Sequence, residues 1–433
     1  MRELLRCGKL VDGSGKPSKS DMAIYIENSV INEVMPWDQV PTADKKTFVD
    51  YSDFVVVPGF IDAHVHLLFT CLEDHDATRK ILETSTHAEL MAVAARNCID
   101  SLLGGVTTVR DLGDIDFVTV SVRELVKSGV IPGPAIYAAG PPITTTAGHL
   151  HWCGNMADTL DEIRKAVRKS CAQEVDVIKV MSSGGNMTRG SNPLMPQYEI
   201  EELTVLVKEA HRLKRRVAAH SLEAQSIRRS IAAGVDTLEH CTWKGNTPED
   251  NDPQTLVNLL KNSQTMVTLT LAGIHRALLD FDRPLSEIVI ASAKAASVTG
   301  DLRTDFNWAK ALVANGIDVA LASDAGVRFT SFRDFNESIE AALVALDVDF
   351  ETVISMATKI AAKAVGISDK VGTLEKGMLA DIAILKQPAE GRKIGSVHDV
   401  YKHGKKMVED GNLVIAGQES FGTLNAFEAL GNR

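Results

Sequence analysis

The chain has 433 residues, of which 45% are hydrophobic and 24% charged, and its formal net charge is −11. The acidic balance and the lack of a basic stripe argue against nucleic acid as a partner, and no apolar run approaches the ~20 residues that span a bilayer. Six cysteines without CxxC spacing, and a start without an apolar signal stretch, predict reduced thiols and a cytoplasmic location.

Short apolar runs separated by turn signals predict strands at both ends of the chain. The first set is Leu4–Leu5, Leu10–Val11, Ala23–Ile26 and Val30–Ile31. The second set is Ala380–Leu385, Val397–Tyr401, Lys406–Val408 and Leu413–Ile415. We predict that residues 1–57 and 369–433 meet in one small β-sandwich domain.

Between these ends, strand and helix patterns alternate in the order typical of a parallel sheet. The eight predicted strands are Val55–His66, Val106–Leu112, Ala135–Gly140, Val175–Met181, Val217–His220, Thr237–His240, Met266–Leu271 and Ile317–Asp324. The predicted helices include Leu90–Leu103, Leu160–Cys171, Ile200–Leu213, Ser226–Ala233, Phe335–Leu346 and Val353–Val365. Eight such units favour a closed (β/α)8 TIM barrel over residues 58–368 rather than an open sheet.

Histidines gather at the ends of three predicted barrel strands, where barrel enzymes carry their chemistry. His64 and His66 end the first strand, and residues i and i+2 of a strand point to the same face. His220 and His240 end the fifth and sixth strands. A single histidine, or one HxH pair, is more often structural. Packing alone does not explain four histidines at three strand ends, so we predict a metal site.

Two further residues could complete such a site. Asp324 follows the eighth strand; taken alone it is as often a turn or N-cap residue, but beside the histidines it is a candidate ligand and general base. Lys179 lies in an apolar strand, where a buried lysine is costly unless it is paired or neutralised. A lysine that faces the surface is the alternative.

Several of these segments resemble the amidohydrolase superfamily. Pro58–His66 is similar to its strand-one signature, and Val371–Asp381 is similar to its C-terminal return segment. In the binuclear, carboxylated-lysine subtype of this superfamily, strands four, five, six and eight supply metal ligands. The matching residues in this chain are, in that order, Lys179, His220, His240 and Asp324. The run from Gly148 to Gly185 resembles the prolidase-like group, which includes Xaa-Pro dipeptidases and relatives of imidazolonepropionase. Some hydrolases of xenobiotic amides, ureas and carbamates belong to the same neighbourhood.

The resemblance implies two divalent cations, zinc first, with manganese, cobalt or iron as alternatives. Carbon dioxide would convert the lysine into a carbamate that bridges both cations. The assignment is His64, His66 and Asp324 to one cation, His220 and His240 to the other, and Lys179 to both. A metal-bridging hydroxide, with Asp324 as general base, would then hydrolyse an amide-type C–N bond in a small molecule such as a dipeptide or N-acyl amino acid.

Candidate substrate contacts lie in the loops that follow the strands. His149 and His151 come after the third strand, and one of them could polarise the scissile carbonyl or bind a substrate carboxylate; loop packing is an equal alternative. We count His151 as a candidate catalytic residue. Arg189 and Arg328 could pair with an anionic group of the substrate or be solvated surface charges.

Leu222 marks a departure from the prolidase-like dipeptidases, which commonly carry a tyrosine or another polar residue at this point after the strand-five histidine. Leucine has no donor for a substrate carboxylate, and Trp243 and Trp152 could add apolar surface. The sequence therefore predicts a preference for N-acyl amino acids, anilides or aryl ureas over free dipeptides.

Three other functions are weaker. A metal-free lyase or aldolase with a Schiff base on Lys179 would leave the four histidines unexplained. A non-catalytic relative would be expected to have lost ligands that this chain keeps. Deaminases of this fold typically use one metal and lack the strand-four lysine. The sequence leaves open whether the chain forms a homo-oligomer.

Overall fold

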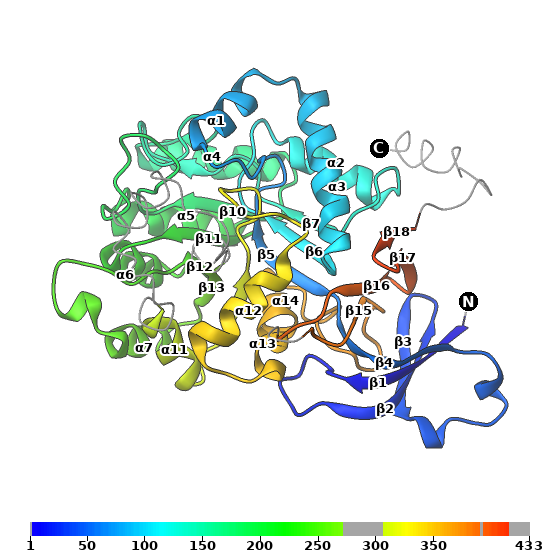
Figure 1. Cartoon of the computed structure of the whole chain (residues 1–433). Helices are drawn as coiled ribbons and strands as arrows, with labels where there is room; N and C mark the ends of the chain where they lie inside the picture. Colours follow the sequence, from blue (N-terminus) through cyan, green and yellow to red (C-terminus); the bar gives the residue numbers. More distant parts are fainter. Residues whose placement is uncertain (1, 272–305, 390–392, 415–433) are drawn as a thin grey trace.

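The computed structural model describes residues 2–271, 306–389 and 393–414. Two parts lie next to each other in it (Figure 1): a barrel of parallel strands surrounded by helices, and a small sheet built from both ends of the chain. All six cysteines are free thiols, as predicted. Among the helices of the described residues, none combines the length and apolar character that a membrane crossing requires.

The small sheet confirms that the two ends of the chain meet. Its eight strands are β1 (Arg2–Leu10), β2 (Lys19–Glu27), β3 (Val30–Pro36), β4 (Val49–Pro58), β15 (Ile382–Leu385), β16 (Val397–Lys402), β17 (Lys405–Glu409) and β18 (Asn412–Leu413), in the spatial order β18-β17-β16-β15-β4-β1-β2-β3. Gly404, in the β16–β17 turn, lies against Ile26 at the end of β2, although β15, β4 and β1 lie between these strands in the sheet order. The sheet is therefore curled. Ile415, the end of the last predicted strand, lies outside the described residues, with the rest of the predicted domain after it.

The barrel contains all eight predicted strands. They are β5 (Phe60–Val65), β6 (Val106–Asp111), β7 (Ala135–Ala138), β10 (Val177–Met181), β11 (Arg216–Ser221), β12 (Thr237–His240), β13 (Met266–Thr270) and β14 (Val319–Ala322). Parallel pairing joins β5–β6–β7 and β10–β11–β12–β13–β14; a short strand, β8 (Ile143–Thr144), pairs with β10, and a second, β9 (Asn155–Met156), pairs with β8. The N–H of Asp176 donates to the carbonyl oxygen of Ala138 at 2.8 Å, between β7 and β10, and the N–H of Asp324, just after β14, donates to the carbonyl oxygen of His64 on β5 at 2.9 Å, so the ring closes.

The first predicted strand, Val55–His66, is divided in the structure. β4 ends at Pro58 in the small sheet, and β5 begins at Phe60 in the barrel. Gly59, between them, packs so closely on Thr107 that a Cβ atom would lie 2.4 Å from the threonine hydroxyl. The N–H of Gly59 donates to the backbone carbonyl oxygen of Asp381 at 2.8 Å. An apolar run cannot reveal such a change of sheet, because both strands are buried. The predicted domain boundary at residues 57 and 58 lies beside this point and stays a prediction.

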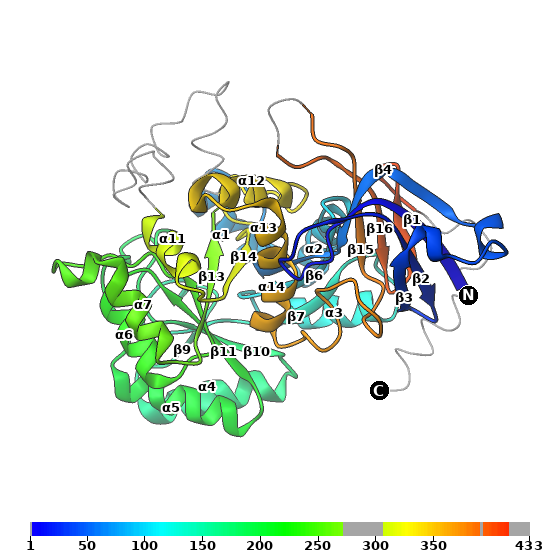
Figure 2. The ribbon, with the colours of Figure 1, turned by 90° about the horizontal axis from the view of Figure 1, so that it is seen from below.

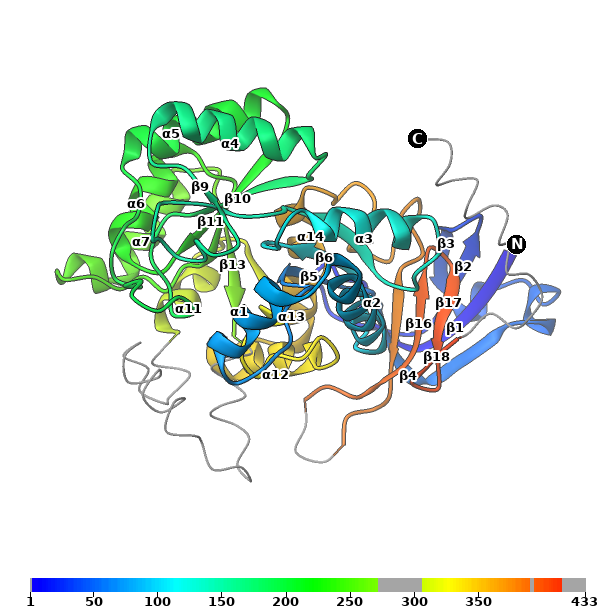
Figure 3. The ribbon, with the colours of Figure 1, turned by 90° about the horizontal axis from the view of Figure 1, so that it is seen from above.

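Helices form the outer layer of the barrel (Figures 2 and 3). They are α1 (His75–Thr84), α2 (His87–Leu103), α3 (Val118–Lys127), α4 (Leu160–Ala172), α5 (Ile200–Arg212), α6 (Ala224–Ala233), α7 (Pro253–Lys261), α11 (Asn307–Ala314), α12 (Phe335–Leu346), α13 (Phe350–Ala357) and α14 (Lys359–Val365). Capping boxes begin α2 at Thr86 and α4 at Thr159. α2 also contacts β16, β17 and β18, and so joins the barrel to the small sheet.

The single predicted helix Val353–Val365 is wrong in one respect, because the structure has two helices there. Thr358 has φ −134° and ψ −87°, far from helical values. Its hydroxyl donates to the carbonyl oxygen of Ile354 at 2.6 Å. This break lets α13 and α14 turn separately onto β14 and β5, at the seam where the barrel closes.

Candidate metal centre

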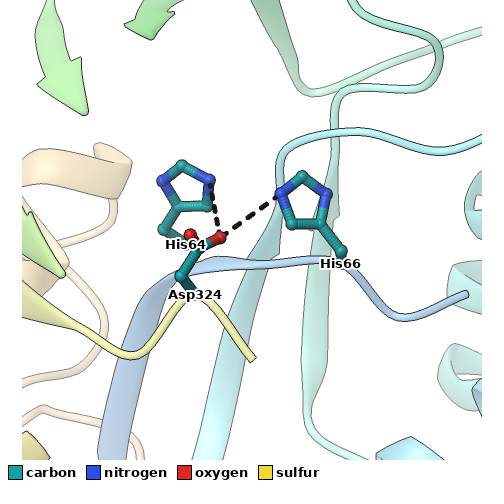
Figure 4. Close-up of side chains that lie close together, drawn as sticks. All are labelled: His64, His66 and Asp324. Carbon is teal, nitrogen blue, oxygen red and sulfur yellow. Dashed lines mark ion pairs between the residues drawn. The ribbon is translucent and has the colours of Figure 1, made fainter. Parts of the chain in front are cut away.

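The seam of the barrel brings the first group of candidate ligands together. The N–H of Asp324 donates to the carbonyl oxygen of His64 at 2.9 Å, and that of His66 donates to Ala325 at 2.8 Å. Asp324 has φ +63°, a left-handed conformation that aspartate tolerates better than most residues. Its carboxylate faces both imidazoles (Figure 4), with Oδ1 3.4 Å from Nε2 of His64 and 3.4 Å from Nε2 of His66.

Five imidazole rings form a continuous row at this end of the barrel. The centroids of neighbouring rings are 5.3 Å apart for His66 and His64, and 4.9 Å for His64 and His240. They are 4.8 Å apart for His240 and His220, and 4.7 Å for His220 and His149. The structure thus brings all four histidines of the predicted metal site into one cluster, with His149 as a fifth member.

Each of the four predicted ligand histidines uses one ring nitrogen for a hydrogen bond within the protein. The pairs are His64 Nδ1 with Glu239 Oε2 (2.9 Å), His66 Nδ1 with the Gly113 carbonyl (3.0 Å), His240 Nδ1 with Thr270 Oγ1 (2.7 Å) and His220 Nε2 with the Gly184 carbonyl (3.1 Å). A ring N–H that donates in this way leaves the lone pair of the other nitrogen for a metal ion.

Burial keeps three of these imidazoles, those of His64, His220 and His240, neutral. It lowers the pKa of His64 to about 3, with a contribution from Lys179, and it lowers the pKa of His240 to about 4. The pKa of His220 also falls well below its ordinary value, again through burial first. Burial by itself would raise the pKa of Asp324, but the surrounding imidazoles lower it below its ordinary range. Neutral imidazoles beside an ionised carboxylate are the states in which these groups bind cations.

Lys179 faces the interior of the barrel, as predicted. It lies in the middle of β10, is 2% exposed, and places Nζ 3.4 Å from Nε2 of His64. Burial lowers the pKa of the lysine to about 8. An ammonium group is therefore disfavoured at this place, because water cannot solvate it.

The donor atoms fit a divalent transition-metal ion. One atom each from His64, His66 and Asp324 lies within 4.8 Å of the others. Oδ1 of Asp324 is buried and has no hydrogen-bond partner in the described part of the chain. Buried carboxylate oxygens normally have such a partner, so this atom is one that a cation would satisfy. Imidazole and carboxylate ligands suit zinc, manganese, cobalt and iron alike.

The structure distinguishes the two candidate histidines of the loop after the third barrel strand. His149 is 4% exposed and lies against His220, and its Nδ1 has no hydrogen-bond partner among the described residues. His151 instead places Nδ1 2.9 Å from the carbonyl oxygen of Gly148, in its own loop. His149 is therefore the histidine whose ring contacts the cluster.

The other substrate-contact candidates differ in their surroundings. Leu222 is half-buried directly after β11, and its N–H donates to the hydroxyl of Ser183 at 3.0 Å. Trp243 is 3% exposed: its Nε1 donates to the carbonyl oxygen of Asp252 at 2.9 Å, and the guanidinium of Arg228 covers its ring. These contacts engage Trp243 in packing against α6 and the loop that follows β12.

The two candidate arginines also differ. Arg189 is exposed in the loop after β10. Arg328 is half-buried in the loop after β14; its Nε donates to the carbonyl oxygen of Glu73 at 2.6 Å, and a guanidinium nitrogen is 3.4 Å from His75. Arg328 thereby ties the loop after β14 to the loop after β5, at the edge of the cluster.

Two features of the site were missed by the sequence reasoning. Glu239 and Arg110 form a buried ion pair next to His64, and a charged residue inside a predicted barrel strand is a visible signal. Phe69 stacks on His66 with ring centroids 4.6 Å apart, and Trp152 lies 6.1 Å from Phe69. The sequence indicates Trp152 only as apolar surface and does not reveal Phe69 as its partner.

Two known proteins are similar to this chain in sequence. The chain is 32% identical to ochratoxinase from Aspergillus niger over 269 residues, which are 55% of this chain and 54% of ochratoxinase. The match therefore spans about half the length of that relative. Imidazolonepropionase from Bdellovibrio bacteriovorus is 24% identical over 413 residues, 89% of this chain and 88% of that protein.

Among solved structures, a Xaa-Pro dipeptidase with methionine bound in its active site superimposes with a TM-score of 0.78 and 26% identity. The superposition covers 94% of this chain and 99% of the dipeptidase. The sequence pattern of the family described as "Amidohydrolase family" matches residues 55–407, which is most of the chain. The protein therefore belongs to the amidohydrolase family.

Proposed function

We propose that this protein is a metal-dependent hydrolase of amide-type C–N bonds. The observation that carries the proposal is the group of His64, His66 and Asp324, whose donor atoms face one point at the barrel seam. These three residues would hold one divalent cation. His220 and His240 would hold a second, and Lys179, as a carbamate, would join the two. Zinc is the first choice of metal, with manganese, cobalt or iron as alternatives.

When bound, the two cations would lower the pKa of water from 15.7 toward about 7 and polarise the scissile carbonyl. Asp324 would accept the proton of the attacking water at its carboxylate and deliver it to the leaving nitrogen. His149 would donate a hydrogen bond from Nδ1 to the carbonyl oxygen of the substrate. We assign that role to His149 rather than His151 because its ring contacts His220 and its Nδ1 has no partner.

Metal analysis tests the proposed centre directly. The purified, metal-loaded protein should contain about two divalent cations per chain and lose activity to chelators. His66→Ala and His220→Ala should each lower the metal content by about one ion, because they remove ligands of different cations. His87→Ala is the control, since His87 is exposed on α2 and faces Asp116. A fully active protein with no more than one ion per chain would contradict the proposal.

The surroundings of His66 support a substrate with an apolar or aryl portion. Phe69 stacks on this ligand, and Trp152 belongs to a cluster with Leu150, Cys153 and Met181. The similarity to a Xaa-Pro dipeptidase suggests a peptide bond or a related amide bond as the target. We therefore propose N-acyl amino acids and related amides as substrates, with anilides, aryl ureas and carbamates as a second class favoured by the aromatic residues.

Leu222 allows the substrate preference to be measured. The ratio of kcat/KM for an N-acyl amino acid to that for its carboxamide should be small in the wild type, because leucine cannot bind the carboxylate. Leu222→Tyr should raise the ratio about tenfold to a hundredfold, the value of one hydrogen bond to a charged group. Leu222→Phe controls for size without adding the hydroxyl. A large wild-type ratio that Leu222→Tyr leaves unchanged would point to another carboxylate contact, such as Arg328, and to a peptidase.

A further inference from the structure

A buried carboxylate lies directly behind the row of imidazoles. Glu239, on β12, is 0% exposed and uses its two oxygens differently. Oε2 is 2.9 Å from Nδ1 of His64. Oε1 accepts from a guanidinium nitrogen of Arg110 at 2.8 Å and from the hydroxyl of Thr237 at 2.5 Å. The carboxylate thus connects the buried guanidinium of Arg110 with His64, a candidate metal ligand.

Arg110 fixes the position of this carboxylate from the centre of the barrel. It belongs to β6, is 2% exposed, and donates from Nε to the carbonyl oxygen of Ala63 at 2.7 Å. Ala63 directly precedes His64. Arg110 also donates to the hydroxyl of Thr268 on β13 at 3.3 Å. The guanidinium therefore holds both the backbone that carries His64 and the carboxylate that accepts from its ring.

His240 can reach His64 beside Glu239 because the backbone departs from strand geometry at His240. Successive residues of a regular strand point to opposite faces. His240 has φ +67°, however, and both Glu239 and His240 contact His64. Two adjacent residues therefore face the same site: Glu239, the partner of His64, and His240, itself a candidate metal ligand.

His64 differs from the other candidate ligands in this partner. At the ring nitrogen turned away from the cluster, His66 and His220 meet backbone carbonyls, and His240 meets a hydroxyl. Within the described ranges, His64 is the one of the four whose corresponding nitrogen meets a carboxylate. A carboxylate makes the imidazole a stronger ligand than a neutral acceptor does, and it fixes the tautomer.

We propose that Glu239, held by Arg110, is a positioning residue for His64: it keeps the ring proton on Nδ1 and turns Nε2 toward Asp324 and Lys179. The inference rests on the proposed metal centre and adds a specific consequence. Loss of the carboxylate should weaken the cation held by His64, His66 and Asp324 more than the cation held by His220 and His240. A buried ion pair adds little net stability, so packing is a poor explanation for charges at these two positions.

The test measures zinc binding by competition with a chromophoric chelator in Glu239→Gln and in the double variant Arg110→Met/Glu239→Gln. The double variant removes both charges, so no unpaired guanidinium remains buried if the single variant fails to fold. The affinity for one of the two cations should fall about tenfold to a hundredfold. The visible spectrum of the cobalt-loaded protein should change as well, because it reports the ligand field. The thermal midpoint of the metal-free double variant should stay close to that of the wild type.

Glu209→Gln is the matched control. Glu209 lies on α5, and its carboxylate also pairs with arginines, Arg168 of α4 and Arg212 of α5. These contacts do not include the imidazoles. The variant should leave zinc affinity unchanged. A folded double variant with wild-type zinc affinity and an unchanged cobalt spectrum would overturn the positioning role. A wild-type protein that binds no divalent cation would instead overturn the proposed function, so the two failures are distinguishable.

Discussion

Replacing Asp324 by asparagine should lower turnover by at least about a hundredfold while the protein keeps most of its metal. Asparagine has nearly the same shape, retains an oxygen that can face His64 and His66, and tolerates the left-handed backbone at this position. Its amide cannot accept the proton of the attacking water. Turnover and metal content should be measured on the same sample, so that chemistry and binding can be separated.

Asp318→Asn is the control for this substitution. Asp318 lies just before β14, and thus at the opposite end of the strand from Asp324, where it forms an ion pair with Lys363 at 2.6 Å. This variant should keep both metal and turnover. If metal and turnover fall in strict proportion in Asp324→Asn, the aspartate is a ligand and not the base.

Lys179→Ala should reduce turnover by on the order of a thousandfold, because a metal centre contributes several kcal/mol of transition-state stabilisation. The carbamate that would join the two cations cannot form without the amine, so metal content should fall as well. The fold should persist, since the substitution removes a buried amine whose ammonium form is disfavoured by burial. Metal analysis, turnover and the thermal midpoint of the metal-free protein together check this expectation.

Addition of a short carboxylate such as propionate should restore part of the activity of Lys179→Ala, because it can occupy the space of the missing bridge. Lys402→Ala is the control for loss of a lysine away from the imidazoles. Lys402 is half-buried at the end of β16 in the small sheet and donates to the carbonyl oxygen of Gly133 at 2.7 Å. This variant should not respond to propionate. Wild-type turnover of Lys179→Ala without any additive would show that the lysine is structural.

The barrel and the positions of its candidate ligands can be predicted from the sequence alone. Apolar runs of strand length alternate with amphipathic helices, and eight such units close most readily into a ring. In a ring of parallel strands every carboxyl end lies on one face. Residues that end separate strands, such as His64, His220, His240 and Asp324, must therefore come close in space. The strand order and the residue at which each strand ends are enough for this conclusion, and both can be predicted from local patterns in the sequence.

The tertiary structure alone decided which groups contact those ligands. Whether His149 or His151 reaches the cluster depends on the path of a loop, and loops lack the periodicity from which strands are predicted. Trp243 comes shortly after His240, the last residue of β12, yet it packs against Arg228. Positive φ values at His240 and Asp324 set where their side chains point. Pairing between Glu239 and Arg110 joins positions 129 residues apart, and only the closed ring brings them into contact.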